Sequence, residues 1–268
     1  MKAYVRNIER ERKPFYKTAK ADMLRALKVQ TDEFKVRLRK CETPEEINYQ
    51  ASKSVDSEPI TKAMQSIYVK TGKHFAVKTY NGLTKSKQMK RVTQPVTEDY
   101  WFDYMNRFVT AKLGQRIRWI TGTTEDVFKD TCRRITSAGI ETGASVETMA
   151  REIMAKLDVT QYYRAERIAR TEVNTASNEA SIAGAKATGL ELVKEWMSFI
   201  DEKTRDSHAF MNGVTVGIDE KFEVPDAYGV IDLMDYPLDP AGSASNVIEC
   251  RCTIGYNGAE GGIEWGRF

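Results

Sequence analysis

The stretch IARTEVNTASNEASIAGAKATG, residues 168–189, decides the fold expected for this chain. It forms the second half of a long helix that we predict from Thr160 to Lys186. One side of that helix carries small side chains at steps of four and three residues, at Ala169, Val173, Ala176, Ala180, Ala183 and Ala187. Another backbone can approach such a seam closely. We therefore expect the helix to be the central support of its domain, ended by Gly189 at the C′ position.

The chain before this helix is predicted to form further helices, because apolar residues recur at three- and four-residue spacings among good helix formers. Thr43-Pro44, Thr124-Glu125 and Ser145-Val146 each begin with a residue type that caps helices, and acids follow each of them. Between Lys70 and Thr97 the sequence is rich in Lys, Thr, Gly and Gln, so we predict a long exposed connection with short helical pieces there.

Strands and turns are predicted after Gly189. Residues 190–197 alternate in the manner of a strand, and Asn212-Gly213 is a tight-turn pair that could join residues 209–211 to 214–216 in a hairpin. Residues 247–254 are predicted to form the last strand. The predicted fold class is therefore α+β, with a mainly helical N-terminal region followed by a compact C-terminal module of a long helix plus short antiparallel strands.

Length and composition fit a globular protein with two parts. The 268 residues are 41% hydrophobic and 29% charged, which is typical of soluble globular proteins. We predict a division into residues 1–157 and residues 158–268. No stretch approaches the length of about 20 apolar residues that spans a bilayer, and the first residues lack an apolar signal core, so we expect synthesis in a cytoplasm.

Charge is distributed unevenly along the chain. Residues 1–40 contain 13 Lys and Arg against 5 Asp and Glu, whereas residues 189–268 contain 6 against 15. A basic end suits a polyanion such as DNA, because phosphate contacts are electrostatic. The alternative is an ordinary solvated helix face that makes ion pairs with its neighbours. The candidate DNA contacts are Lys2, Arg6, Arg10, Arg12, Lys13, Lys17 and Lys20.

Cysteine and histidine could form a metal site near the end of the chain. Cys250 and Cys252 lie two residues apart in a predicted strand, so both thiols are expected on one face. His208 and an acid such as Asp239 could complete a tetrahedral zinc site. Alternatively, both thiols are small buried hydrophobes and His208 makes an ordinary hydrogen bond.

Polar side chains beside the alanine seam offer a second candidate site. Arg170 and Asn174 are one helical turn apart and could hold the following strand region by hydrogen bonds. Glu172 could instead face a substrate, but no partner base or nucleophile accompanies it. Residues 201–208 contain acids, Arg205 and His208, and are interpreted as a turn locked by its side chains in preference to an active site.

The order of these residues resembles that of the tailed-phage minor head proteins of the Mu F-like head morphogenesis family. The resemblance extends from about Arg164 to Cys252. It begins with Ile168-Ala169-Arg170-Thr171-Glu172 and ends with Pro237, Asp239-Pro240 and Cys250-Arg251-Cys252. The residues in between that follow the family pattern are Asn174, Asn178, Trp196, Asp201, Thr204, Arg205, His208 and Gly213. Each of these motifs alone is weak evidence for the family, whereas the ordered set over about 90 residues is specific to it.

The resemblance implies a non-enzymatic virion protein of the head or neck, assembled in the host cytoplasm. It would act at the portal vertex or capsid interior in head assembly and in DNA packaging or delivery. The implied partners are the portal oligomer, major capsid or scaffold proteins and viral double-stranded DNA, with no membrane required. The N-terminal helices would contact the portal, the capsid or the DNA.

Two alternatives accompany this resemblance. An enzyme or toxin-like effector carried in the virion, either an ADP-ribosyltransferase or a nuclease, would use an Arg, a Glu or a His of the kind named above. For the metal site, the resemblance implies that relatives have a Cys-x-x-Cys turn and a His-Pro pair before the final cysteines, which together would form a metal site. This sequence instead has Arg205, His208 and Asp239-Pro240, so one thiol is missing and an acid replaces a histidine.

Overall fold

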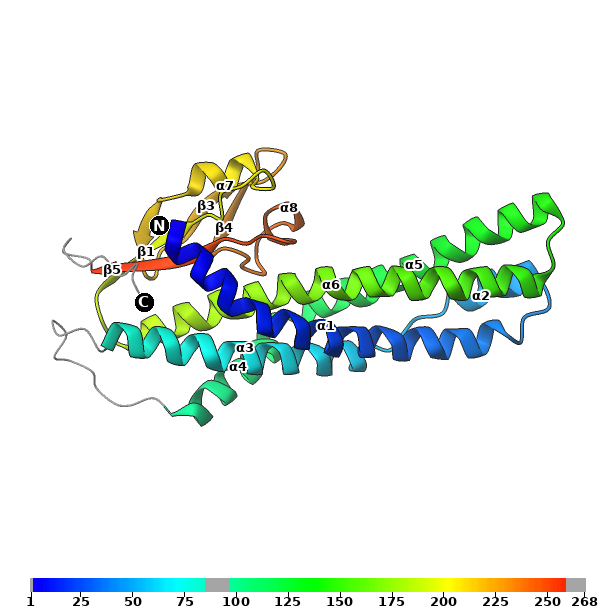
Figure 1. Ribbon diagram of the computed structural model, residues 1–268, viewed down its shortest axis with the longest axis horizontal. Helices are drawn as coiled ribbons and strands as arrows, with labels where there is room; N and C mark the ends of the chain where they lie inside the picture. Colours follow the sequence, from blue (N-terminus) through cyan, green and yellow to red (C-terminus); the bar gives the residue numbers. More distant parts are fainter. Residues whose placement is uncertain (1, 85–96, 259–268) are drawn as a thin grey trace.

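The computed structural model describes residues 2–84 and 97–258. Figure 1 shows an elongated helical bundle with the strands gathered at one end, beside the N-terminus of the chain. The α+β prediction is confirmed. The bundle consists of α1 (Lys2–Leu38), α2 (Pro44–Ala51), α3 (Glu58–Thr84), α4 (Glu98–Lys112), α5 (Gly114–Thr142) and α6 (Val146–Ala187).

Local capping explains where several of these helices begin. The Thr43 hydroxyl accepts the backbone N–H of Glu46 at the start of α2, and Pro44 occupies the first turn. Ser145 accepts the N–H of Thr148 in the same way, so α6 starts at Val146 and is longer than predicted. The helix start predicted at Thr124 is wrong, because Thr124 lies inside α5 and its hydroxyl donates to the carbonyl of Ile120.

The exposed connection predicted between Lys70 and Thr97 is wrong for its first half. Residues 70–84 belong to α3, which buries Phe75, Ala76 and Tyr80 in the main helical core. Residues 85–96 lie outside the described part of the chain. Thr97 then caps α4 by accepting the N–H of Tyr100.

The alanine-seamed helix is the central element of the bundle. In α6, residues Ala169, Val173, Ala176, Ala180 and Ala183 are buried in a core shared with α1, α3 and α4. Close approach also occurs at Gly184, where a Cβ atom would lie 2.6 Å from the carbonyl oxygen of Ala76 on α3. α6 continues unbroken through residues 157 and 158, where the two-part division was predicted. Gly189 follows it with φ +67°, as expected of a C′ glycine.

The C-terminal module is built on the end of α6. The predicted first strand is confirmed as β1 (Leu192–Met197), which lies between β2 (Thr215–Gly217) and β5 (Thr253–Gly258), all antiparallel. A separate hairpin pairs β3 (Phe222–Pro225) with β4 (Ile231–Met234). Leu83 of α3 and Ile182 of α6 share a core with Leu192, Tyr236 and Ile254 of the module, so the module and the bundle are packed together.

Two details of the module differ from the prediction. Asn212-Gly213 does not join two strands, because residues 206–211 form the short helix α7 (Asp206–Met211) before β2. Residues 247–254 are not one strand, since α8 (Ala244–Val247) ends there and β5 begins at Thr253. Among the described residues, no helix is long and apolar enough to cross a membrane.

Candidate functional site

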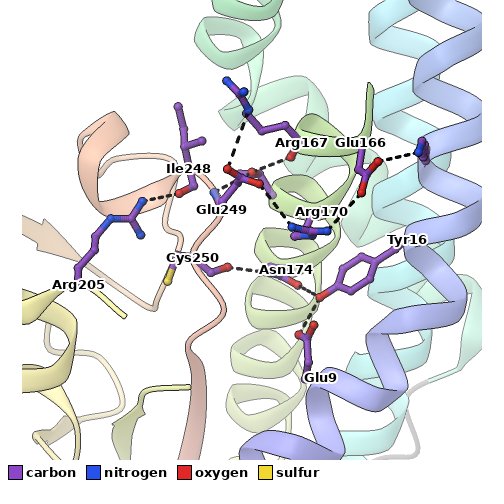
Figure 2. A network of polar contacts seen from close by, with 12 residues as sticks. Glu9, Tyr16, Glu166, Arg167, Arg170, Asn174, Arg205, Ile248, Glu249 and Cys250 are labelled. Carbon is purple, nitrogen blue, oxygen red and sulfur yellow. Dashed lines mark hydrogen bonds and ion pairs between the residues drawn. The ribbon is translucent and has the colours of Figure 1, made fainter. Parts of the chain in front are cut away.

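Polar residues of α6 hold the loop that precedes β5. The Asn174 side chain donates to the carbonyl of Cys250 at 2.7 Å, and the Thr171 hydroxyl accepts the backbone N–H of Glu249 at 3.0 Å. Arg170 reaches the carboxylate of the same Glu249 at 3.5 Å. Figure 2 shows Arg170 and Asn174 pointing from α6 toward the loop that carries Glu249 and Cys250. Glu249 has a left-handed backbone (φ +56°), a conformation unusual for a non-glycine residue, and these contacts surround it.

Asn178, one helical turn after Asn174, is hydrogen-bonded to its full capacity. Its amide nitrogen donates to the carbonyls of Pro237 (2.7 Å) and Cys252 (3.1 Å). Its oxygen accepts from the Arg12 guanidinium at 2.7 Å and from the Thr253 hydroxyl at 3.2 Å. The Asn178 side chain therefore connects α6 to α1, to the loop after β4 and to the start of β5.

Arg12 is not a DNA contact as predicted, because it is 1% exposed. Its guanidinium donates to Ser177 at 2.8 Å and to the carbonyls of Arg251 and Cys252, besides Asn178. Sequence analysis missed this role although a signal was present: Arg12 follows the buried Ile8 by four residues and so falls on the apolar face of α1.

Glu172 is buried in a network between α3, α5 and α6. Its carboxylate accepts from Arg116 at 2.7 Å and from the Tyr68 hydroxyl at 2.8 Å. Burial raises the pKa of Tyr68 well above its usual range, with the Glu172 charge adding to the effect. Burial alone would lower the pKa of Arg116, but the charge and hydrogen bond of Glu172, together with Tyr68, outweigh it and the pKa is raised. Both carboxylate oxygens of Glu172 therefore have internal partners, and the side chain faces no solvent.

The turn before α7 is held by side chains. Asp201 accepts the N–H of Lys203 at 2.9 Å and two bonds from the Arg251 guanidinium at 2.6 and 2.5 Å. The hydrogen bonds from Arg251 outweigh desolvation and lower the pKa of Asp201 to about 2. Arg205 donates to the carbonyl of Ile248 at 2.6 Å and forms no ion pair with the residues that the structure describes.

Two further motif residues pack around this turn. Trp196 is fully buried and donates from its indole nitrogen to Ser198 at 3.1 Å. Gly213 has φ +92° and donates its N–H to the carbonyl of Trp196. A left-handed conformation at that point is open to glycine without strain.

His208, Cys250 and Cys252 come together in the core of the module, and all three are buried. The Nδ1 atom of His208 lies 3.4 Å from the Cys250 sulfur and 3.6 Å from the Cys252 sulfur. The two thiols influence each other. Burial raises the pKa of Cys250 well above its usual range. In Cys252, hydrogen bonds from Cys250 and His208 outweigh burial and lower the pKa.

Asp239 does not join this group, contrary to the prediction. Its carboxylate accepts the backbone N–H groups of Asp235 at 2.7 Å and Ala241 at 2.9 Å, so it closes its own loop. Burial raises the pKa of Asp239. Within the described ranges, the group of possible metal ligands consists of one imidazole and two thiols.

Five of the predicted DNA contacts form one exposed stripe on α1. This basic stripe comprises Lys2, Arg6, Arg10, Lys13 and Lys17. At 3.6 residues per turn their side chains fall within about 80° of the helix circumference and extend over about 22 Å. Across the described part of the chain, none of the five forms an ion pair. Lys20 does form one, with Glu166 at 2.7 Å, so it is not a free cation.

Comparison with known proteins finds similarity to one family model and to curated proteins. A family model described as phage Mu protein F like protein matches residues 130–255. The chain is 26% identical over 257 residues to the NAD(+)–arginine ADP-ribosyltransferase EFV of Enterococcus faecalis. The aligned region covers 89% of this chain and 49% of that protein. It is 30% identical over 135 residues to the uncharacterized protein YqbB of Bacillus subtilis, covering 49% and 41% respectively. The chain spans about half or less of these curated relatives.

No solved structure matches the chain. The family match spans α6 and almost all of the module, and it includes the α6 side chains that hold the loop before β5. Over residues 130–255, this match supports the resemblance to the phage Mu protein F-like family.

Proposed function

We propose that the protein is a minor component of a phage head that acts near the portal vertex or in the capsid interior. There it would serve head assembly and DNA packaging or delivery. The observation that carries this proposal is the family match over residues 130–255. Arg170, Asn174 and Asn178 use their polar groups in internal contacts that fix the module to the bundle, which suits a scaffold.

Two of the side chains named above for an enzymatic function, Glu172 and His208, are buried and engaged in internal contacts. Glu172 is 2% exposed and both of its oxygens are hydrogen-bonded. His208 is also 2% exposed, and its two ring nitrogens face Asn246 and the two sulfurs. A catalytic acid or base must come within hydrogen-bond reach of its substrate, and neither group is accessible to one.

The basic stripe supports contact with packaged DNA. Its five cations lie on one side of α1 and are free of internal ion pairs in the part of the chain that the structure describes. Such a surface can neutralise phosphates without reading base sequence, which is what a protein near a packaged genome requires.

Fractionation of phage particles tests the head assignment. A lysate of the phage that encodes the chain is separated on a density gradient, and the protein is followed by an epitope tag. We expect it to co-sediment with heads and to co-purify with the portal oligomer after the capsid is disrupted. Recovery only among free proteins, with none in purified particles, would refute the proposal.

ADP-ribosyl transfer to arginine is the second candidate, favoured by the similarity to the Enterococcus faecalis protein over 89% of this chain. Purified protein is incubated with labelled NAD and an arginine-containing acceptor. We expect no transfer of label. Transfer that is retained in Glu172→Ala would point to another catalytic residue, and transfer that is lost there while the fold survives would identify Glu172. Either result would replace the purely structural function.

A further inference from the structure

We propose that His208, Cys250 and Cys252 bind one zinc ion through three protein ligands, and that the fourth coordination position is open to solvent. The three side chains come from α7 and from the loop between α8 and β5, and their possible ligand atoms all lie within 4.8 Å of one another. Imidazole nitrogen and thiolate sulfur are the ligands that zinc prefers in proteins.

The two distances from the imidazole nitrogen to the sulfurs match edges of a zinc tetrahedron, and the two sulfurs lie within 4.8 Å of each other. Bond lengths of about 2.3 Å for Zn–S and about 2.05 Å for Zn–N, at a tetrahedral angle, give an N···S separation of about 3.6 Å. In the protein, His208 Nδ1 lies 3.4 Å from the Cys250 sulfur and 3.6 Å from the Cys252 sulfur. An ion therefore fits among the three atoms with little rearrangement.

Asn246 sets the histidine in the state that binds a metal. The amide nitrogen of Asn246 donates to Asp232 at 2.8 Å, which leaves its oxygen as the acceptor facing His208 Nε2 at 3.2 Å. Nε2 must then carry the proton, and Nδ1 presents a lone pair toward the two sulfurs. Metal-binding histidines have this arrangement, with the second ring nitrogen donating to a fixed oxygen.

The backbone around the cysteines is also held in place. The N–H of Cys252 points to the Cys250 sulfur at 3.4 Å, a contact that holds this sulfur in place. The carbonyl of Cys250 accepts from Asn174 and that of Cys252 accepts from Asn178. The contacts that join the module to α6 thus fix the positions of both sulfur ligands.

The fourth position is open because no further ligand is near and space is present. In the described ranges no other His, Cys, Asp or Glu belongs to the group, and Asp239 is bound in its own loop. A small cavity of about 20 Å³ adjoins His208 and both cysteines, and Thr204 and Arg205 also line it. That volume holds one water molecule, which would complete the tetrahedron.

Hydrogen bonding among three neutral groups is the competing explanation. In that case Cys250 and Cys252 are small buried hydrophobes that donate weakly to His208 Nδ1 and Ser198. One lone pair on Nδ1 cannot serve two thiol donors equally well, whereas one metal ion would engage all three ligand atoms. The two explanations differ in metal content, which can be measured.

The experiment uses the full chain, purified without added chelator and analysed for metal. We expect about one zinc ion per chain in the wild type and in Cys132→Ser, the matched control, because Cys132 is buried in the separate core near α2. Cys252→Ser should lose the ion. Wild-type protein that folds without zinc, and that takes up neither Zn²⁺ nor Co²⁺ after reduction, would overturn the proposal.

Cobalt substitution tests the open position without relying on any variant. The wild type loaded with Co²⁺ should show the visible bands of tetrahedral cobalt together with sulfur-to-metal charge transfer, and a small anion that can replace the water, such as cyanide or azide, should shift them. A tetrahedral spectrum that no added ligand changes would refute the open position. Asn246→Leu should weaken Zn²⁺ binding by about 10- to 100-fold with the ligands intact, whereas unchanged affinity would contradict the role given to Asn246.

Discussion

Replacing Asn178 by leucine tests the contacts that join the module to the bundle. Leucine is similar in size but offers no hydrogen bond, so the change removes all four bonds that Asn178 makes. The carbonyl of Pro237 and the hydroxyl of Thr253 each lose their hydrogen bond to Asn178. The Arg12 guanidinium and the carbonyl of Cys252 lose one hydrogen bond each but keep other contacts. A buried polar group left without a partner costs about 1–3 kcal/mol, so for the Pro237 carbonyl and the Thr253 hydroxyl together we expect a loss of about 2–6 kcal/mol in the free energy of unfolding.

Urea denaturation, followed by tryptophan fluorescence to which the buried Trp101 and Trp196 contribute, measures this loss. A loss of that size is a large share of the roughly 5–15 kcal/mol that stabilises a typical domain. Asn7→Leu is the matched control, because Asn7 is exposed on α1, and surface changes usually stay within about 0.5 kcal/mol. An Asn178→Leu variant with the wild-type denaturation midpoint and slope would refute the view that these contacts hold the module in place.

Three further predictions concern packing, pH dependence and DNA binding. Gly184→Val should destabilise the chain by about 1–3 kcal/mol in the same denaturation assay, because its Cβ would meet the Ala76 carbonyl, and a neutral result would contradict the close approach of α3 and α6. Burial lowers the pKa of Lys194 from 10.5 to about 8, so the unfolded state binds that proton more tightly than the folded state does. The charged Lys194 therefore destabilises the folded state fully below pH 8, and this destabilisation fades as the pH rises to about 10.5. Thermal melts should therefore show Lys194→Met more stable than wild type at pH 7, with the gain shrinking toward pH 10; no gain at pH 7 would disprove the penalty. Removing three cations of the basic stripe, Arg10, Lys13 and Lys17, should reduce the steepness of the plot of log binding constant for double-stranded DNA against log salt concentration by about 2.7. An equal reduction on removing three exposed cations elsewhere would count against the stripe as the DNA contact.

Capping residues and small-residue spacing could be interpreted from the sequence because both act locally. Thr43, Ser145 and Gly189 mark helix ends in the structure as predicted. The helix start predicted at Thr124 is wrong because a threonine inside a helix can donate to the carbonyl four residues back. Of the two acids that follow it, Asp126 is exposed, and Glu125 accepts the backbone N–H of Val55 instead of lying in a first helical turn. The composition of residues 70–84 hid a helix, since its buried face includes Thr71 and Gly72 among the aromatic residues.

The candidate site depended on contacts between distant residues, which local patterns do not reveal. Cys250 and Cys252 were expected to meet through a shared strand face, yet they precede β5 and meet at His208 through the loop geometry. The carboxylate chemistry of Asp239 and its place in the family pattern suggest a metal ligand, but its carboxylate accepts two backbone N–H groups of its own loop instead. Arg12 was assigned to the charged surface by composition, whereas its position on the apolar face of α1 decided its burial.

A density map of the phage particle around its portal is the most direct measurement of the proposed role. If the protein is a structural head component, the helical bundle and its attached module should be found as one body at the portal vertex or on the inner capsid surface. The basic stripe of α1 should then face the packaged DNA. Particles that contain no such density, in a preparation where mass spectrometry also finds none of the chain, would contradict the proposal.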